Sequence, residues 1–121
     1  MKKTIFSIFL LATLIVSNFL LIQSTSADTK LKQVESKYVC MVTNKLFADE
    51  QIEVDVDDKK YYGCCEMCKG KLKNNLASRI SIDPVSGKQV DKATSVIAAA
   101  NNGNVYYFEN EQNLKTFNQI N

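Results

Sequence analysis

The chain has 121 residues, with 15 basic and 13 acidic side chains, a net charge of +2 and no histidine. The absence of histidine excludes a His-based catalytic relay and any nitrogen-rich metal site. Four cysteines are present, and three of them, Cys64, Cys65 and Cys68, lie within five residues. Thiols packed this densely are usually held by a soft metal ion or a disulfide, so sulfur chemistry is the first expectation.

The N-terminus is typical of an export signal. Lys2 and Lys3 precede a mostly apolar stretch over residues 5–22, and small residues at 24–27 predict cleavage after Ala27. The stretch is also long enough for an uncleaved membrane anchor, which is the alternative and the only basis for a membrane contact. Cleavage of a signal peptide at residues 1–27 predicts a periplasmic or secreted protein.

The predicted mature chain is short and balanced in charge. Removing 27 of the 121 residues leaves 94, with 13 basic and 13 acidic side chains. This balance argues against nucleic acid or an anionic membrane surface as a partner, because both require a basic excess. A chain of this size forms one small domain with a marginal apolar core, which often carries a metal or disulfide staple. Residues 28–37 are polar and without a clear period, and we expect them to form a flexible tether.

Residues 38–79 are predicted to form a β-hairpin followed by a helix. Apolar and acidic residues alternate over 52–56, which is typical of a half-buried strand. We expect a turn at 57–60, a returning strand at 61–64 and a lysine-rich helix from 65 to about 77. Apolar side chains and one thiol recur at helical spacing in that helix and indicate its core-facing side: Met67, Cys68, Leu72 and Leu76.

Residues 80–121 repeat this plan without sulfur. The sequence predicts a strand at 94–99, a turn at 101–104 and a returning strand at 105–109. A short helix is expected from Asn110 to Asn118, capped by Asn110 and presenting Leu114 and Phe117 to the core.

The two segments align at a nearly constant offset. Cys64 and Cys68 fall on Glu109 and Asn113 at 45 positions, and Cys40 falls on Ser86 at 46 positions. We therefore expect an α+β fold of two tandem β-hairpin-plus-helix units in one small domain, with residues 38–79 binding and residues 80–121 supporting.

Three cysteines are the predicted primary metal ligands. Cys64 at a strand–helix junction and Cys68 one turn later lie on one helical face, and Cys40 arrives from a separate segment. The helix N-terminus favours thiolates. Three thiolates suit Cu(I), or Zn(II) with a fourth ligand, and Cys65 is either that fourth ligand or a neighbour that exchanges with the others.

The pattern of Cys40, Cys64 and Cys68 before a short helix resembles the TRASH and YHS families of small metal-binding domains. The second unit resembles YHS domains through its start at residues 83–88, Asp-Pro-Val-Ser-Gly-Lys, and through Tyr106-Tyr107-Phe108. The resemblance implies a treble-clef-like, non-catalytic domain for heavy-metal trafficking, resistance or sensing, with another metal-transport or resistance protein as partner. Because Ser86, Glu109 and Asn113 stand at the family's cysteine positions, the second copy is not expected to bind metal through thiolates.

Two other functions remain open. A disulfide from Cys40 into the cluster would make a stapled interaction domain, whereas Cys65 and Cys68 could serve as the C-x-x-C of a thiol–disulfide exchanger. The latter lacks a preceding tryptophan and a βαβ pattern. Met41 and Met67 are candidate soft ligands or, alternatively, core residues. Tyr61, Tyr62, Tyr106 and Tyr107 are expected to be packing residues.

Overall fold

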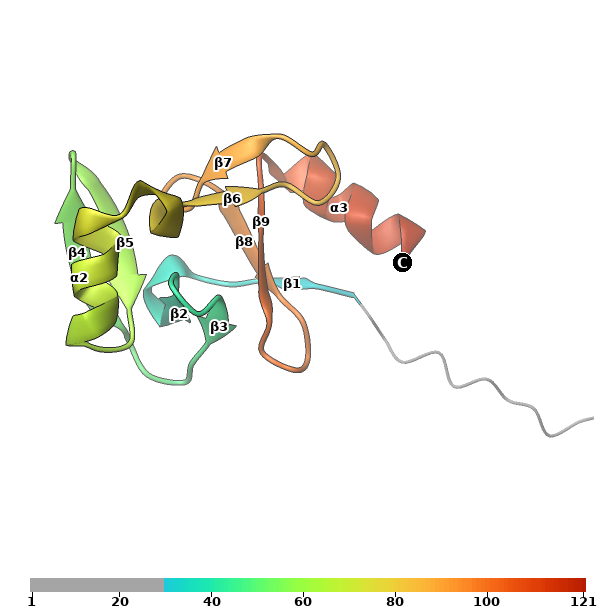
Figure 1. Cartoon of the computed structure of the whole chain (residues 1–121). Coiled ribbons are helices and arrows are strands. Elements are labelled where there is room, and N and C mark those ends of the chain that lie inside the picture. Colours follow the sequence, from blue (N-terminus) through green and yellow to red (C-terminus); the bar gives the residue numbers. More distant parts are fainter. Residues whose placement is uncertain (1–29) are drawn as a thin grey trace, which may run out of the picture.

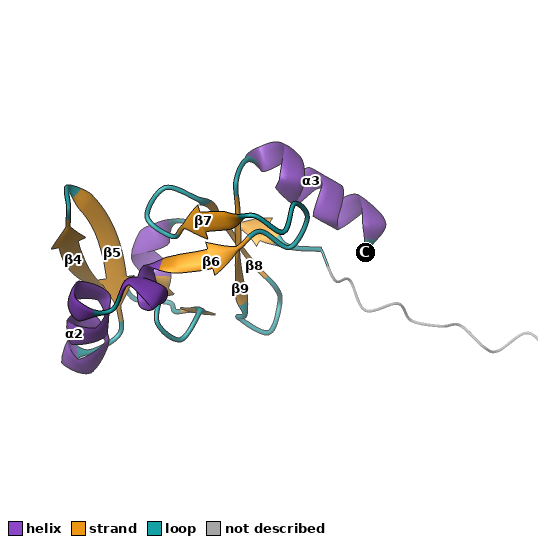
Figure 2. Cartoon of the chain, turned by 45° about the horizontal axis from the view of Figure 1, so that its top comes forward, coloured by secondary structure: helices purple, strands orange, loops and turns teal. Residues whose placement is uncertain are grey.

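The computed structural model describes residues 30–121 and shows the two α-helices of this range at opposite ends, with strands between them (Figures 1 and 2). The predicted signal peptide lies outside these residues. Within the described part of the chain, no helix is long and apolar enough to cross a membrane.

The described elements are two α-helices, two 3-10 helices and four small antiparallel sheets, so the predicted α+β class is confirmed. The largest sheet has the order β1-β8-β9, formed by Lys32–Gln33, Val96–Ala99 and Val105–Phe108. Three two-stranded sheets are β2-β3 (Val39–Cys40, Lys45–Leu46), β4-β5 (Ile52–Val56, Lys59–Gly63) and β6-β7 (Ile80–Ile82, Gln89–Asp91). The helices are α2 (Glu66–Asn74), α3 (Glu111–Ile120), η2 (Ser36–Tyr38) and η3 (Leu76–Arg79).

The β4-β5 hairpin follows the predicted alternation. Val54 pairs with Tyr61, and both are buried, whereas Glu53 and Asp55 are exposed. The turn is shorter than expected, because Asp57 and Asp58 alone make it, with φ of 50° and 61°. Two residues at positive φ match the right-handed twist of a hairpin. The expected turn at 57–60 was therefore wrong for residues 59–60, which belong to β5.

Helix α2 is shorter than the sequence indicated. It ends at Asn74, because the backbone of Asn75 is extended. Asn75 instead caps the following η3 helix, with its Oδ1 accepting a hydrogen bond from the N–H of Ala77. Only Cys68 and Leu72 of α2 are buried. Met67 and Leu76 are 72% and 63% exposed, so the prediction that they pack in the core was wrong.

Helix α3 and the β8-β9 hairpin lie close to the predicted positions. Asn110 caps α3 as predicted, with its Oδ1 accepting from the N–H of Asn113 at 2.9 Å. Leu114 is buried, and the Phe117 ring packs edge-on against Phe108 with centroids 5.7 Å apart. Tyr107 points inward and is buried, whereas its neighbour Tyr106 is 36% exposed.

The segment expected to be a tether is folded over its described part. Leu31 is buried, and Asn118 of α3 accepts from its N–H and donates to its carbonyl. Lys32–Gln33 form β1 at the edge of β8, followed by η2. The expectation of a flexible tether at 28–37 is thus wrong for residues 31–37.

One apolar cluster joins the two halves of the chain. Val39, Val54 and Leu72 of the first half pack in the same cluster as residues of the second half, among them Ile97, Val105 and Tyr107. Backbone hydrogen bonds also cross, from the Leu46 N–H to the Gly103 carbonyl and from the Val105 N–H to the Asn44 carbonyl. The two halves therefore share a core, and the cysteine-bearing strands rest on the second half.

Candidate metal centre

Cys40 is fixed by the short β2-β3 hairpin. It ends β2, is fully buried and pairs with Lys45 of β3 across a turn in which Asn44 has a positive φ of 54°. The N–H of the next residue, Met41, donates to the Tyr62 carbonyl in β5 at 2.8 Å. This bond places Cys40 beside the end of β5, where the other cysteines lie.

Cys64 and Cys68 stand at the junction of β5 and α2, as predicted. Gly63 ends β5, and a Cβ on it would lie 2.9 Å from the Cys68 Cβ, which is closer than real side chains approach. Glycine is therefore what lets the strand pass close to the first turn of α2. Cys64 follows it with an exposed side chain, and Cys68 is buried on the inner side of the helix.

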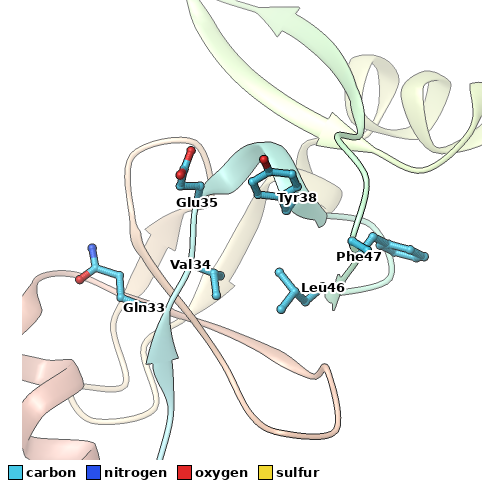
Figure 3. Close-up of a pocket in the computed structure, with 7 residues that line it drawn as sticks. Gln33, Val34, Glu35, Tyr38, Leu46 and Phe47 are labelled. Carbon is cyan, nitrogen blue, oxygen red and sulfur yellow. The ribbon is translucent and has the colours of Figure 1, made fainter.

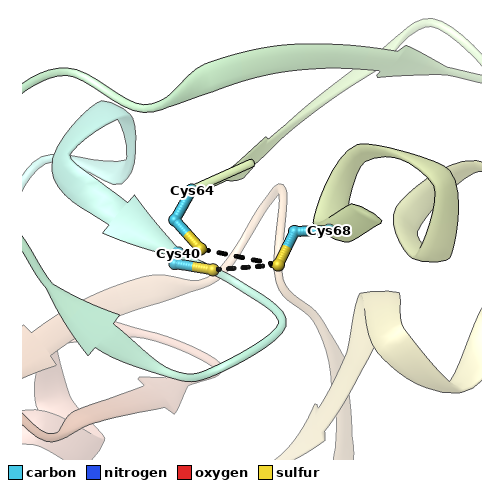
Figure 4. A group of neighbouring side chains, drawn as sticks. All are labelled: Cys40, Cys64 and Cys68. Carbon is cyan, nitrogen blue, oxygen red and sulfur yellow. Dashed lines mark hydrogen bonds between the residues drawn. The ribbon is translucent and has the colours of Figure 1, made fainter. Parts of the chain in front are cut away.

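The three sulfurs converge on one point (Figure 4). The Sγ atoms of Cys40, Cys64 and Cys68 all lie within 4.8 Å of one another, with 3.5 Å between Cys64 and Cys68 and 3.9 Å between Cys40 and Cys68. Metal–sulfur bonds of about 2.3 Å place sulfurs about 3.8 Å apart in tetrahedral geometry and about 4.0 Å apart in trigonal planar geometry. The observed spacing fits a metal ion, and these three cysteines can hold one.

The environment concentrates negative charge on Cys40. Burial acts to raise the pKa of this thiol, but hydrogen bonds from the Thr43 side chain and from the backbone of Thr43, Cys64 and Val42 outweigh it and lower the pKa to about 7. Hydrogen bonding to Cys68 and Cys40 raises the pKa of Cys64 to about 12, and burial raises the pKa of Cys68. In the metal-free protein, therefore, Cys40 is the first of the three to become a thiolate.

Cys65 has a different position from the other three. It is exposed and lies outside the group of converging sulfurs. Its backbone is extended, with φ of −157° and ψ of 172°, and it is the N-cap residue of α2. The backbone N–H of Cys68, and the Cys68 side chain after it, lower the pKa of the Cys65 thiol. Cys65 thus begins the helix at the rim of the site.

The two methionines have different outcomes: Met41 fits the core alternative, whereas Met67 does not pack in the core. Met41 is fully buried in the shared apolar cluster, where it acts as a packing residue. Met67 is largely exposed on α2.

Sequence reasoning missed three residues that shape the site. Thr43 stabilises the Cys40 thiolate, Gly63 permits the close approach of α2, and Lys92 donates from the second half to the Met41 carbonyl behind Cys40. The glycine before Cys64 was a visible signal, because close backbone approach commonly requires glycine. Thr43 lies three residues after Cys40 and is brought to the thiol by the local β2-β3 turn, whereas tertiary contacts alone bring Lys92 to the site.

A separate groove lies between the β1–η2 segment and β3 (Figure 3). Its lining contains no cysteine: Gln33, Val34, Glu35, Tyr38, Leu46, Phe47 and Ala48. The thiol chemistry of the described residues is thus confined to the β2, β5 and α2 junction.

Comparisons with protein-family models, curated proteins and solved structures gave no match.

Proposed function

We propose that this protein binds a soft metal ion through Cys40, Cys64 and Cys68 and carries it as cargo, with Cu(I) as the first candidate and Zn(II) as the second. The observation that supports this proposal is the convergence of three sulfurs from two separate segments within 4.8 Å. No enzymatic step is required of the site. Its task is to hold the ion and release it.

The donor set favours an ion of low coordination number. Structural Zn(II) sites almost always have four ligands. Among the described residues no fourth cysteine or carboxylate joins the three sulfurs, and the chain has no histidine. Cu(I) is selected by soft thiolate ligands. Three sulfurs are sufficient for a planar Cu(I) site, whereas Zn(II) would need water or a rearranged Cys65 as the fourth ligand.

The burial of the ligands supports transfer rather than permanent storage. Cys40 and Cys68 are buried, whereas Cys64 is exposed. An incoming thiolate from a partner can displace Cys64 first, while the two buried sulfurs still hold the ion. This asymmetry fits an exported trafficking, resistance or sensing protein whose partner is another metal-handling protein.

We also propose that the chain is a tandem TRASH/YHS-like protein in which the second unit has lost its ligands. Both halves have the order short hairpin, longer hairpin and helix: β2-β3, β4-β5 and α2, then β6-β7, β8-β9 and α3. Cys65 and Asn110, which the offset of 45 aligns, both cap a helix with nearly the same extended backbone. Export through residues 1–27 is part of the same proposal.

Anaerobic native mass spectrometry of the reduced protein, offered Cu(I) and Zn(II) together, tests the function. We expect one bound ion per chain and protection of three thiols from alkylation. Cys68→Ser should lower the affinity by more than the roughly 10- to 100-fold that the loss of an outer-shell partner costs.

The matched control is Cys65→Asn, which removes a neighbouring thiol and should keep the ion. Unchanged affinity in Cys68→Ser would refute the ligand assignment. A wild-type protein that stays metal-free and is lighter by the hydrogens of one or two disulfides would instead favour the stapled or thiol-exchange function.

A further inference from the structure

Lys92 is a buried cation directly behind the cysteine cluster. It follows β7 in the second half of the chain and is only 4% exposed. Lysine is almost never buried to this extent without a partner, because desolvating an ammonium group is costly. Its burial therefore calls for a compensating charge.

The Lys92 ammonium group reaches across to the turn that follows Cys40. Its Nζ donates to the Met41 carbonyl at 2.6 Å and to the Asn44 Oδ1 at 3.0 Å. It also lies 5.2 Å from the centre of the buried Tyr107 ring. These contacts fix the charge beside the β2-β3 turn and hold that turn to the second half.

Within residues 30–121, no carboxylate forms an ion pair with Lys92. Burial lowers the pKa of Lys92 to about 8, and the negative charge that opposes this shift is the Cys40 thiolate. The neutral oxygens of Met41 and Asn44 accept two of the three ammonium hydrogens and leave the charge of Lys92 uncompensated. Among the described residues, the Cys40 thiolate, one residue before the Met41 carbonyl that Lys92 contacts, is therefore the counter-charge of Lys92.

We propose that Lys92 is a positioning residue that neutralises part of the negative charge of the metal-loaded cluster and thereby tunes its preference between monovalent and divalent soft ions. This inference rests on the proposed function and extends it. Three thiolates give a doubly negative complex with a monovalent ion and a singly negative complex with a divalent ion. A fixed positive charge stabilises the first more than the second, so Lys92 favours Cu(I) over Zn(II).

The test is a competition titration of the reduced protein against chelators, with Cu(I) and Zn(II) measured separately. Lys92→Met removes the charge and keeps a long apolar side chain. We expect the ratio of Cu(I) affinity to Zn(II) affinity to fall on the order of 10- to 100-fold, the effect of one unit charge at roughly 6–12 Å in a medium of effective dielectric about 20.

Two variants separate charge from structure. Lys92→Arg keeps the charge while disturbing the packing, and should keep the wild-type ratio even if both affinities drop. Lys115→Met removes an exposed charge on α3 and should change neither affinity.

Equal losses for both ions in Lys92→Met, or an unchanged ratio, would overturn the role of Lys92 as a counter-charge and leave a packing role. Absence of binding in the wild type would instead refute the proposed function itself. The two failures are therefore distinguishable in one series of measurements.

Discussion

The two strand–helix junctions of this molecule carry opposite kinds of group, cysteine sulfurs after β5 and N–H donors around a carboxylate after β9. At the end of β5, three sulfurs converge within 4.8 Å of one another. At the end of β9, a buried carboxylate, Asp83, accepts hydrogen bonds from the backbone N–H groups of Ser86 and Glu109 and from the Asn113 Nδ2. These three residues are the ones that the offset of 45 or 46 positions aligns with Cys40, Cys64 and Cys68.

The comparison shows how one arrangement can serve two electrostatic purposes. In the second half, N–H donors surround an anion that belongs to the chain, and Asp83 is fully buried and satisfied, with a further bond from the Val85 N–H at 2.7 Å. In the first half, cysteine sulfurs occupy the aligned positions, and thiolate sulfurs are ligands suited to an external soft cation. The second junction is therefore complete without a ligand, whereas the sulfurs of the first lie close enough together that they could hold an ion.

Asp83→Asn tests this comparison with the largest expected effect. The amide cannot accept four hydrogen bonds in the same way and turns its NH₂ toward other donors, so we expect a loss of about 3 kcal/mol in the free energy of unfolding. Urea denaturation of the metal-free protein near neutral pH provides the measurement. The control is Asp49→Asn, an exposed carboxylate, which should change stability by less than about 0.5 kcal/mol.

The same carboxylate gives a pH dependence with a defined sign. Burial acts to raise the pKa of Asp83, but hydrogen bonds from Asn113, Glu109, Val85 and Ser86 outweigh it and lower the pKa below its ordinary value of 3.8. The stability that it contributes is fully present above about pH 3.8 and is lost as the pH falls through the lower folded-state value. Asp83→Asn should therefore be less sensitive than the wild type to acid in that range. Equal acid sensitivity would show that Asp83 does not hold the second junction.

Gly63→Ala tests the first junction. The added Cβ would meet the Cys68 Cβ at 2.9 Å, so α2 must move away from β5. Overpacking of this kind costs about 1–3 kcal/mol, and the movement separates Cys64 from Cys68. We expect weaker metal binding and lower stability together. Gly70→Ala is the control, because a Cβ there meets nothing within 4 Å and the residue lies within α2. Tight metal binding by Gly63→Ala would contradict the geometric role of the glycine.

Local signals predicted the parts of the structure that local interactions determine. The alternation at 52–56 marked β4, and Asn110 marked the start of α3, because strand alternation and helix capping are both expressed over a few residues. The convergence of Cys40, Cys64 and Cys68 followed from placing Cys64 and Cys68 at a strand–helix junction.

Long-range contacts determine the features that local sequence patterns did not predict. The polar pair Lys32–Gln33 forms β1 only because β8 offers an edge, and Leu31 is buried only because α3 lies nearby. Burial of Lys92 depends likewise on a turn from the other half of the chain. Met67 was placed in the core by its spacing, yet α2 is too short and too exposed to bury more than one narrow face.

Cys65→Asn tests whether the N-caps of α2 and α3 are equivalent, and its expected effect on stability is the smallest of these substitutions. Asn110 holds the corresponding position and caps α3 through its side-chain oxygen, whereas Cys65 presents to the Cys68 N–H only a thiol sulfur, which is a weak acceptor and makes no capping bond of good geometry. Asparagine is among the best N-cap residues, so the substitution should raise the free energy of unfolding by about 1 kcal/mol while metal affinity stays the same. Urea denaturation and a Cu(I) competition titration on the same sample measure both quantities. A gain in stability with a loss of affinity would mean that Cys65 joins the ion as a fourth ligand, and the two junctions would then differ in ligand number as well as in charge.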